Sequence, residues 1–246
     1  MRSLTYSIDC YTDPGSRTVN EDAVAIARTP KLLALLVADG LGGIGGGEVA
    51  SAAAARALRE GAAQMENVTV ETVADLCGQM NQAVLGQQTD AQRMKSTFAT
   101  VCWDNKALVF AHAGDSRIYQ FRKGGILYQS RDHSVSQMAV AAGEIKPGQI
   151  RFHIDRNKVL RTLGTPEETF RPEIHVSETP LLPGDALLLC SDGFWEYVTE
   201  REMLFLLGRC TDAERWLGRM RKRMLRKNIH NQDNHSAVAL ICQRSV

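Results

Sequence analysis

Residues 37–51 read Val37-Ala38-Asp39-Gly40-Leu41-Gly42-Gly43-Ile44-Gly45-Gly46-Gly47-Glu48-Val49-Ala50-Ser51. The apolar run that begins at Leu32 stops at a carboxylate, Asp39, and six of the next eight residues are glycine. A small-residue segment typical of a helix follows. A buried strand that ends in a carboxylate, followed by few Cβ atoms, lets a ligand approach the main chain closely. The stretch therefore predicts either a phosphate-binding loop or a metal site that includes Asp39.

The first residues of the expected helix favour the metal site. A nucleotide-binding P-loop needs Gly-Lys-Ser/Thr at this position, whereas this chain has Gly47-Glu48-Val49. The glutamate would repel a phosphate group. A glycine-rich nucleotide-binding enzyme is therefore disfavoured, and the metal hypothesis requires further carboxylates at similar strand ends.

The composition is that of an ordinary globular protein, with 246 residues, 44% of them hydrophobic and 23% charged, and a net charge of +1. This charge gives no reason to expect a nucleic-acid or membrane partner, and the longest apolar run is too short to span a bilayer. The N-terminus has no signal-peptide core. Six scattered cysteines without a Cys-x-x-Cys pair favour buried free thiols. We expect a cytoplasmic monomer with one domain over residues 1–246.

Strand and helix patterns come in blocks along the chain, which favours an α+β fold with antiparallel sheets and helices packed outside. Strands are expected at 4–12, 23–26, 32–38, 98–103, 107–113, 117–121, 126–128, 187–190 and 237–242. Helices are expected at 47–64, 70–85, 135–142, 200–207 and 212–226. Residues 143–166 show no clear periodicity and are expected to form a surface flap, which either selects substrates or only covers a site.

Six carboxylates end expected strands or lie in tight turns: Glu21, Asp22, Asp39, Asp115, Asp192 and Asp233. Any one of them alone would be read as a turn residue. Six clustered carboxylates without cations would repel and raise one another's pKa values. Bound divalent metals relieve that repulsion, and ligation by oxygen alone suits Mg²⁺ or Mn²⁺.

The order of these residues and their flanks resembles the successive motifs of the metal-dependent protein phosphatases of type 2C, in their compact bacterial branch. The motifs are Arg17-x-x-x-Glu21-Asp22, Asp39-Gly40-x-Gly42-Gly43, Gly114-Asp115-Ser116-Arg117, Asp132-His133-Ser134, Ser191-Asp192-Gly193-x-Trp195 and Asp233-Asn234-x-Ser236. They cover nearly the whole chain, and their order is more specific than any one of them. The resemblance implies a four-layer α/β/β/α sandwich with two central antiparallel sheets.

The resemblance also implies two metal ions, Mn²⁺ or Mg²⁺, in each active site, and a weaker third. The implied ligands are Asp39 for both ions, Asp192 and Asp233 for the first, the Gly40 carbonyl with Glu21 or Asp22 for the second, and Asp115 with Asp192 for the third. Arg17 matches the residue that grips the substrate phosphate. The catalytic residues implied are therefore Arg17, Asp39 and Asp192.

The implied reaction is hydrolysis of phosphoserine and phosphothreonine in proteins, opposing a Ser/Thr kinase. Two metals about 3.5–4 Å apart lower the pKa of a bridging water, and the resulting hydroxide can attack phosphorus in line without a phosphoenzyme. The metals and the paired donors of Arg17 would neutralise the charge that develops on the phosphoryl oxygens.

Three positions depart from the family pattern. Leu41 stands where some members have a histidine proposed as general acid, so that role has no candidate here. Ile44 replaces a histidine common in the bacterial branch, and Ser96-Thr97 replaces a more usual threonine pair. No departure removes a metal carboxylate.

Other hypotheses stay open. The chain could be a pseudophosphatase that only binds phosphoproteins, although a binding module has no need of the whole carboxylate set. It could also be a regulatory phosphatase for one anti-sigma antagonist, although it has no spare length for a sensor domain. His133 could be catalytic or structural. The basic run 215–227 could dock acidic or phosphorylated partners, or could be the solvated face of an amphipathic helix.

Overall fold

The computed structural model describes residues 4–41, 45–227 and 230–243. Gly42, Gly43 and Ile44, which belong to the predicted glycine-rich motif, lie outside the described residues. The helix expected after them, α1 (Gly47–Gln64), has the predicted bounds. So does the next helix, α2 (Val70–Leu85), which begins after a capping box formed by Thr69 and Thr72.

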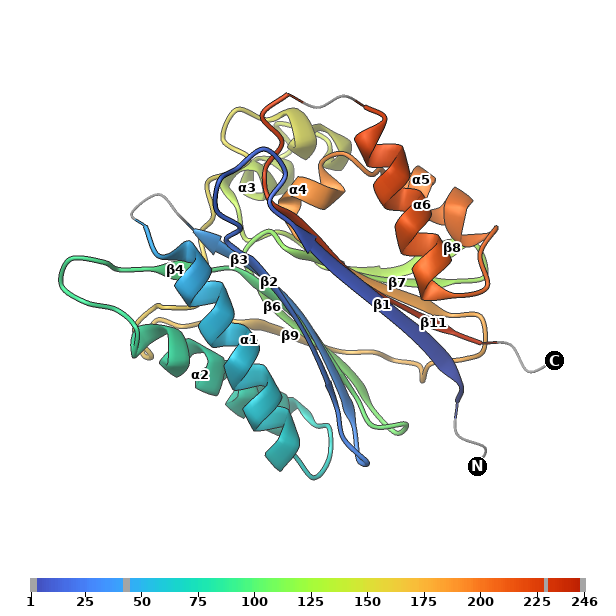
Figure 1. The fold of residues 1–246 in the computed structure, drawn as a ribbon, viewed down its shortest axis with the longest axis horizontal. Helices are drawn as coiled ribbons and strands as arrows, with labels where there is room; N and C mark the ends of the chain where they lie inside the picture. Colours follow the sequence, from blue (N-terminus) through green and yellow to red (C-terminus); the bar gives the residue numbers. More distant parts are fainter. Residues whose placement is uncertain (1–3, 42–44, 228–229, 244–246) are drawn as a thin grey trace.

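The strands form two antiparallel sheets that lie face to face (Figure 1). The first sheet has the order β1-β11-β10-β7-β8, and its strands are β1 (Tyr6–Asp13), β11 (His235–Cys242), β10 (Ala186–Cys190), β7 (Arg117–Arg122) and β8 (Gly125–Gln129). The second has the order β2-β3-β5-β6-β9, with β2 (Asp22–Arg28), β3 (Leu33–Leu41), β5 (Phe98–Trp103), β6 (Leu108–Ala113) and β9 (Glu173–Val176). A two-residue strand, β4 (Lys95–Ser96), pairs with the end of β3.

Helices cover the outer faces of both sheets, which completes the predicted α/β/β/α sandwich (Figure 1). Helices α1 and α2 pack against the second sheet. The first sheet is covered by α5 (Glu200–Leu207) and α6 (Ala213–Leu225), and the short helices α3 (Val135–Ala141) and α4 (Asp192–Trp195) lie near one end of it. No helix in the described part of the chain is long and apolar enough to cross a membrane.

The alternation along β3 explains its unbroken apolar sequence. Leu33, Leu35 and Val37 point into the core between the two sheets, whereas the residues between them point toward α1 and α2. Both faces of the strand are buried, so both need apolar side chains. Asp39 is the next residue whose side chain points between the sheets. At this end of β3, a carboxylate therefore replaces the apolar core.

Some local expectations differ from the structure. Strand β3 continues past Asp39 to Leu41, because β4 supplies pairing for Gly40 and Leu41. Residues 192–195, for which no helix was predicted, form α4, and β9 has too few residues to leave a clear pattern in the sequence. The flap segment 143–166 contains a 3-10 helix, η2 (Pro147–Phe152), and returns to the body of the protein through main-chain pairs at Val159 and Leu163.

Candidate metal centre

The predicted carboxylates converge at one end of the space between the sheets. Asp22 and Asp39 are directly paired across β2 and β3, so their side chains leave the same face of the second sheet. Asp192 begins α4 two residues after the end of β10, Asp233 lies two residues before β11, and Asp115 lies in the turn from β6 to β7. Because Cys190 of β10 is paired with both Arg117 and Ala237, these three segments meet at the same end of the first sheet.

The carboxylates strongly perturb one another. Burial raises the pKa of Asp39 well above its usual range, and the charges of Asp22, Asp192 and Asp115 raise it further. Burial likewise raises the pKa of Asp192, with Asp115 as the next cause. Burial raises the pKa values of Asp22 and Asp115 to about 7. This cluster is therefore costly for the protein unless protons or cations compensate its charge.

Hydrogen bonds from Ser96 of β4 and from Thr97, which lies between β4 and β5, fix the main chain of Asp39 in place. Its carbonyl oxygen accepts hydrogen bonds from Thr97 N at 2.8 Å and from Ser96 Oγ at 2.9 Å. Thr97 Oγ1 in turn lies 2.7 Å from Ser116 Oγ, in the turn that carries Asp115. The Ser96-Thr97 pair, noted as a departure from the family pattern, thus connects two of the predicted ligand segments through its hydroxyl groups.

Asp22 is held across the gap between the sheets. Ser191 Oγ donates to Asp22 Oδ2 at 2.8 Å, and Ser191 Oγ also accepts from Ser236 N at 2.9 Å. The other carboxylate oxygen, Asp22 Oδ1, is buried without a hydrogen-bond partner among the described residues. An ionised carboxylate oxygen without a partner is an unfavourable arrangement that a cation would relieve.

Asn234 joins the two loops that carry Arg17, Glu21 and Asp233. Its Oδ1 accepts from Glu21 N at 2.8 Å, while its Nδ2 donates to the carbonyl oxygens of Pro14 and Val19 at 2.9 and 3.0 Å. Asn234 belongs to one of the motifs quoted above, but no role was predicted for it. Its position next to Asp233, just before a strand, was the sequence feature that could have indicated this role.

Two glycines bring the main chain of α1 against β3. A Cβ atom on Gly40 would lie 2.0 Å from the carbonyl oxygen of Gly47, and a Cβ on Gly47 would lie 2.6 Å from Glu21 Oε1. Burial raises the pKa of Glu21, as do the charges of Glu48 and Asp233. The close approach predicted from the glycine-rich stretch is thus present, and it places Glu21 beside the start of α1.

The Asp115 turn is supported from both sides. Gly114 has φ +105°, its carbonyl accepts from His133 N at 2.8 Å, and its own N–H donates to His133 Nδ1 at 3.3 Å. On the other side, Trp195 Nε1 donates to the carbonyl of Asp115 at 2.8 Å. The guanidinium of Arg117 stacks on the Trp195 ring, 3.4 Å from the ring centroid. His133 therefore supports the Asp115 turn, which agrees with the hypothesis that its role is structural.

Arg17 lies on the exposed side of the cluster. Its Nε and Nη2 donate to Oδ1 and Oδ2 of Asp233, both at 3.1 Å. Both side chains are about half exposed, at 59% and 45%. Arg17 therefore brings paired donors to the open side of the carboxylates, where a phosphate group from solvent could reach them.

A second cluster, formed by His112, His133 and Glu173, does not have the features of a metal site. The two imidazole rings stack at 4.7 Å with an angle of 6° between their planes, so one ion cannot lie in both planes. His133 already has partners at both ring nitrogens: Gly114 N donates to Nδ1 at 3.3 Å, and Nε2 lies 3.3 Å from both Glu173 Oε2 and Arg161 Nη1. This cluster is a hydrogen-bonded support for the Asp115 turn.

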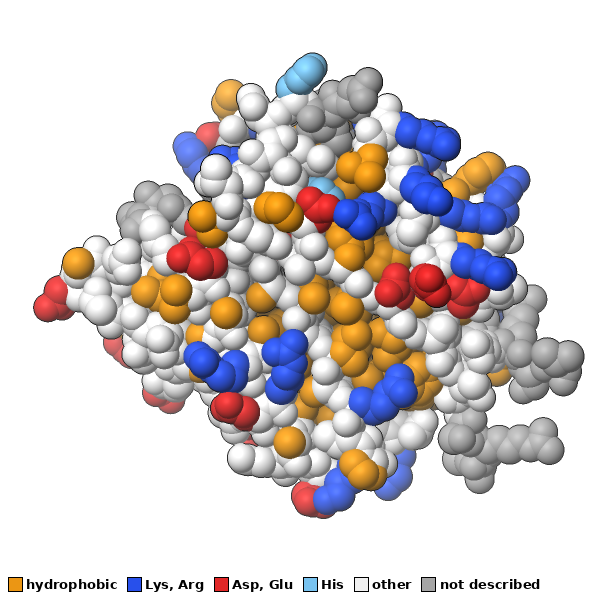
Figure 2. All heavy atoms as spheres, viewed as in Figure 1, with side chains coloured by type: hydrophobic (Ala, Val, Ile, Leu, Met, Phe, Trp, Pro, Cys, Tyr) orange, Lys and Arg blue, Asp and Glu red, His pale blue; other side chains and the backbone are white. Residues whose placement is uncertain are grey.

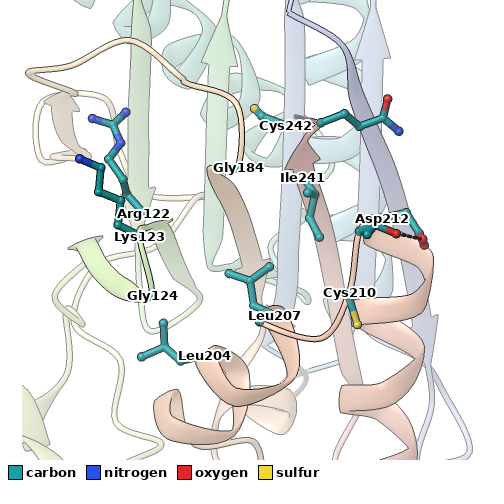
Figure 3. A pocket seen from close by; sticks show the side chains of 13 residues that line it. Arg122, Lys123, Gly124, Gly184, Leu204, Leu207, Cys210, Asp212, Ile241 and Cys242 are labelled. Atoms are coloured by element: carbon teal, nitrogen blue, oxygen red, sulfur yellow. Dashed lines mark hydrogen bonds between the residues drawn. The ribbon is translucent and has the colours of Figure 1, made fainter. Parts of the chain in front are cut away.

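The main carboxylate cluster, by contrast, has the donor chemistry of a divalent-metal site. Its candidate ligands are oxygens, which Mg²⁺ and Mn²⁺ prefer. The raised pKa values and the partnerless Asp22 Oδ1 are what such ions would relieve. A cavity of about 870 Å³ lies at the other end of the first sheet, between Lys123, Leu204 and Ile241 (Figure 3), and its lining includes none of these carboxylates.

The two-sheet sandwich with acidic residues at one end defines the class of metal-dependent phosphatases, and comparison with known proteins gives the family. Residues 15–232 match the family model described as Protein phosphatase 2C. The chain belongs to the protein phosphatase 2C family. It is 31% identical over 177 residues to the serine/threonine phosphatase stp of Listeria innocua serovar 6a, with 69% of each chain covered.

Solved structures agree with this assignment. The serine/threonine phosphatase PstP/Ppp of Mycobacterium tuberculosis superposes with a TM-score of 0.83 and 27% identity, covering 98% of this chain and 100% of that one. The catalytic domain of serine threonine protein phosphatase PstP in complex with 2 manganese ions has a TM-score of 0.83 and 26% identity, over the same shares of the two chains.

Proposed function

We propose that this protein is a metal-dependent phosphoserine/phosphothreonine protein phosphatase that opposes a Ser/Thr kinase. The observation that carries the proposal is the convergence of Asp22, Asp39, Asp115 and Asp192, each with a raised pKa, beside the exposed Arg17–Asp233 pair. Family membership and the serine/threonine phosphatases among the relatives support the same reaction.

The proposed metal ligands are oxygen atoms of the cluster. Asp39 would hold both ions of a pair, Asp192 and Asp233 would complete the first, and the Gly40 carbonyl with Glu21 or Asp22 would serve the second. Asp115, together with Asp192, would hold a weaker third ion. When bound, Mn²⁺ or Mg²⁺ supplies Lewis acidity and a water-derived nucleophile at neutral pH. The complex of PstP with manganese supports this choice of ion.

The protein's own groups would bind and orient the phosphate. Arg17 would leave Asp233 and direct two parallel N–H donors at phosphoryl oxygens, which stabilises the charge that develops there. The exposed position of the Arg17–Asp233 pair keeps the cost of that exchange small. The nucleophile comes from water, so we propose direct attack on phosphorus without a phosphoenzyme. Leu41 has no acidic proton and therefore cannot act as a general acid for the leaving group.

We propose that residues 1–246 act as one catalytic domain, monomeric and cytoplasmic, on phosphorylated Ser/Thr proteins. The free thiols of all six cysteines suit a reducing compartment. A pseudophosphatase on the same fold is the second candidate, and the complete carboxylate set counts against it.

Hydrolysis of a small aryl phosphate and of a phosphothreonine peptide tests the proposal. Each substrate is assayed with Mn²⁺, with Mg²⁺ and with chelator, alongside a folded Asp192→Ala variant. We expect metal-dependent turnover that chelation and the variant both abolish. A folded wild type that binds the phosphopeptide but turns over neither substrate in any metal would support the pseudophosphatase instead.

A further inference from the structure

We propose that the outward face of α6 docks an acidic segment of the phosphoprotein substrate beside the phosphorylated residue. The proposal rests on the phosphatase function and gives that function a substrate preference. Four cations define this face, which we call the α6 stripe: Arg215, Arg219, Lys222 and Arg226.

The α6 stripe follows from helical spacing. Its members are separated by four, three and four residues, so they share one side of the helix and extend along it for about 16 Å. All four are exposed, whereas Trp216, Leu217, Met220 and Met224 of the same helix are buried against the first sheet. The amphipathic pattern expected for this run is therefore present, and its charged face is exposed, so the docking hypothesis for this face still stands.

Neighbouring cations of this helix already have carboxylate partners. Arg221 pairs with Asp13, and Arg223 and Lys227 both pair with Glu202. These three side chains lie on the flanks of α6 and fasten it to β1 and α5. Their charges are largely compensated, so they contribute little to a docking surface.

The α6 stripe is less compensated than its flanks. Arg215 contacts Asp212 at 3.5 Å, and Arg219 donates to the carbonyl of Arg209 at 3.1 Å. Lys222 and Arg226 have no carboxylate partner within 4.0 Å among the described residues. The end of the stripe toward the C-terminus therefore presents two free cations to solvent.

The surface around the α6 stripe is also positively charged. Residues 200–227 contain nine Lys and Arg but four Asp and Glu, in a chain whose total net charge is +1. Figure 2 shows the blue side chains gathered at the upper right, over α5 and α6 of Figure 1. A positive potential concentrated on one face attracts acidic partners over distances up to about a Debye length of 8–10 Å.

The stripe also points toward the metal centre. Arg221 is bound to Asp13, and Asp13 is paired with His235, two residues beyond Asp233. The C-terminal end of α6 thus lies at the same end of the first sheet as the carboxylates, as Figure 1 shows. An extended substrate chain could lay its phosphate at Arg17 and continue along the stripe, where about five residues would span 16 Å.

This placement favours an acidic polypeptide over other polyanions. A protein phosphatase must hold a polypeptide at its metal centre, and the stripe begins where that polypeptide would leave it. The proposed substrate therefore carries a run of Asp or Glu residues on one side of the phosphorylated Ser or Thr. Duplex DNA and anionic lipid vesicles are the competing partners, and the experiment below includes both.

The test compares charge-reversal variants with matched charge change. Lys222→Glu with Arg226→Glu alters the stripe, and Lys106→Glu with Lys123→Glu is the control. Lys106 and Lys123 are exposed and lie in turns at the ends of their sheets opposite the metal centre. The substrates are a small aryl phosphate, a neutral phosphothreonine peptide, and two peptides with four glutamates either before or after the phosphothreonine.

We expect one of the acidic peptides to have a kcat/KM about tenfold above that of the neutral peptide, with an advantage that declines as NaCl is raised. The stripe variant should lose that advantage, whereas the control variant should keep it. The aryl phosphate is too small to reach the stripe, so its kcat/KM should be the same in all three proteins. Binding of the unphosphorylated acidic peptide, followed by fluorescence anisotropy, should weaken in the stripe variant alone.

Several results would overturn the inference. One is equal kcat/KM for acidic and neutral peptides in the wild type, and another is an equal loss in the control variant. A third is binding of duplex DNA or phosphatidylserine vesicles to the stripe without binding of the acidic peptide. Failure of the proposed function would look different, because the wild type would then hydrolyse neither the aryl phosphate nor the neutral peptide.

Discussion

The guanidinium of Arg17 and the carboxylate of Asp233 form a two-point pair, Nε to Oδ1 and Nη2 to Oδ2, at 3.1 Å each. The pair joins the loop after β1 to the loop before β11, at the open side of the metal centre. Because both side chains are about half exposed, the pair contributes at most about 1 kcal/mol to folding. Its residues are therefore available for other partners, which we propose are the substrate phosphate and a metal ion.

Replacing Arg17 should damage substrate binding and leave folding intact. Arg17→Ala is expected to lower kcat/KM for a phosphothreonine peptide about tenfold to hundredfold, largely by raising KM. Arg17→Lys should be intermediate, because it keeps the charge but loses the paired donors. Arg28→Ala, at the far end of β2, is the control. An Arg17→Ala enzyme with the wild-type KM would remove Arg17 from phosphate binding.

Unlike the exposed Arg17–Asp233 pair, the buried ion pair of Arg117 and Asp132 should contribute strongly to folding stability. Their side chains are 5% and 2% exposed, and the closest contact is 2.7 Å. Asp132→Ala would deprive the buried Arg117 guanidinium of its two-point partner and leave Glu200, 3.5 Å away, as its remaining carboxylate contact. We therefore expect a loss of about 3–5 kcal/mol in the free energy of unfolding. Glu66→Ala, which breaks the exposed pair with Lys31, should cost less than about 1 kcal/mol. Similar losses in the two variants, measured by urea unfolding, would contradict this distinction.

Gly114 is expected to tolerate no side chain. Its φ is +105°, and a Cβ atom would lie 2.6 Å from Cβ and Cγ2 of Thr97. We expect Gly114→Ala to destabilise the fold by more than about 2 kcal/mol, because backbone strain and a steric clash add. Gly218→Ala is the matched control, since a Cβ there meets nothing within 4 Å and α6 gains a better helix former. That variant should be more stable by about 0.5–1 kcal/mol.

Metal binding should release protons. With pKa values of about 7, Asp22 and Asp115 hold protons for much of the time at pH 6.5, and the proton must leave before a metal binds. Calorimetric titration with Mn²⁺ in buffers of different ionisation enthalpy should therefore show proton release at pH 6.5 and much less at pH 8.5. The apparent affinity should rise with pH over the same range. Asp22→Asn should release fewer protons, whereas Asp90→Asn, on the exposed link after α2, should match the wild type.

The layered architecture was predictable because its signals are local. The apolar run before Asp39 needed burial on both faces, and α1 and α2 have the bounds that their residue patterns predicted. The convergence of the carboxylates was also predictable, since each of them lies near a strand end or in a tight turn. The resemblance to a family then supplied the order of the motifs, which local patterns alone could not interpret.

The connections around the site depend on contacts distant in sequence. Ser191 reaches Asp22 across 169 positions of the chain, and Asn234 bonds to Glu21 across 213. No periodicity predicts such pairs. The same holds for the support that His133 gives to Gly114, and for β9, whose four residues pair with β6 only after the sheet has formed.

The central claim is that the converged carboxylates hold the metal ions on which hydrolysis depends. The most direct measurement is a calorimetric titration of Mn²⁺ into wild-type protein and into Asp39→Asn, with phosphothreonine-peptide turnover recorded on the same samples. The account predicts at least two ions per chain in the wild type, and in the folded variant a loss of binding together with a loss of turnover of about a thousandfold or more. Wild-type turnover in Asp39→Asn, or turnover in the wild type that persists after chelation, would contradict it.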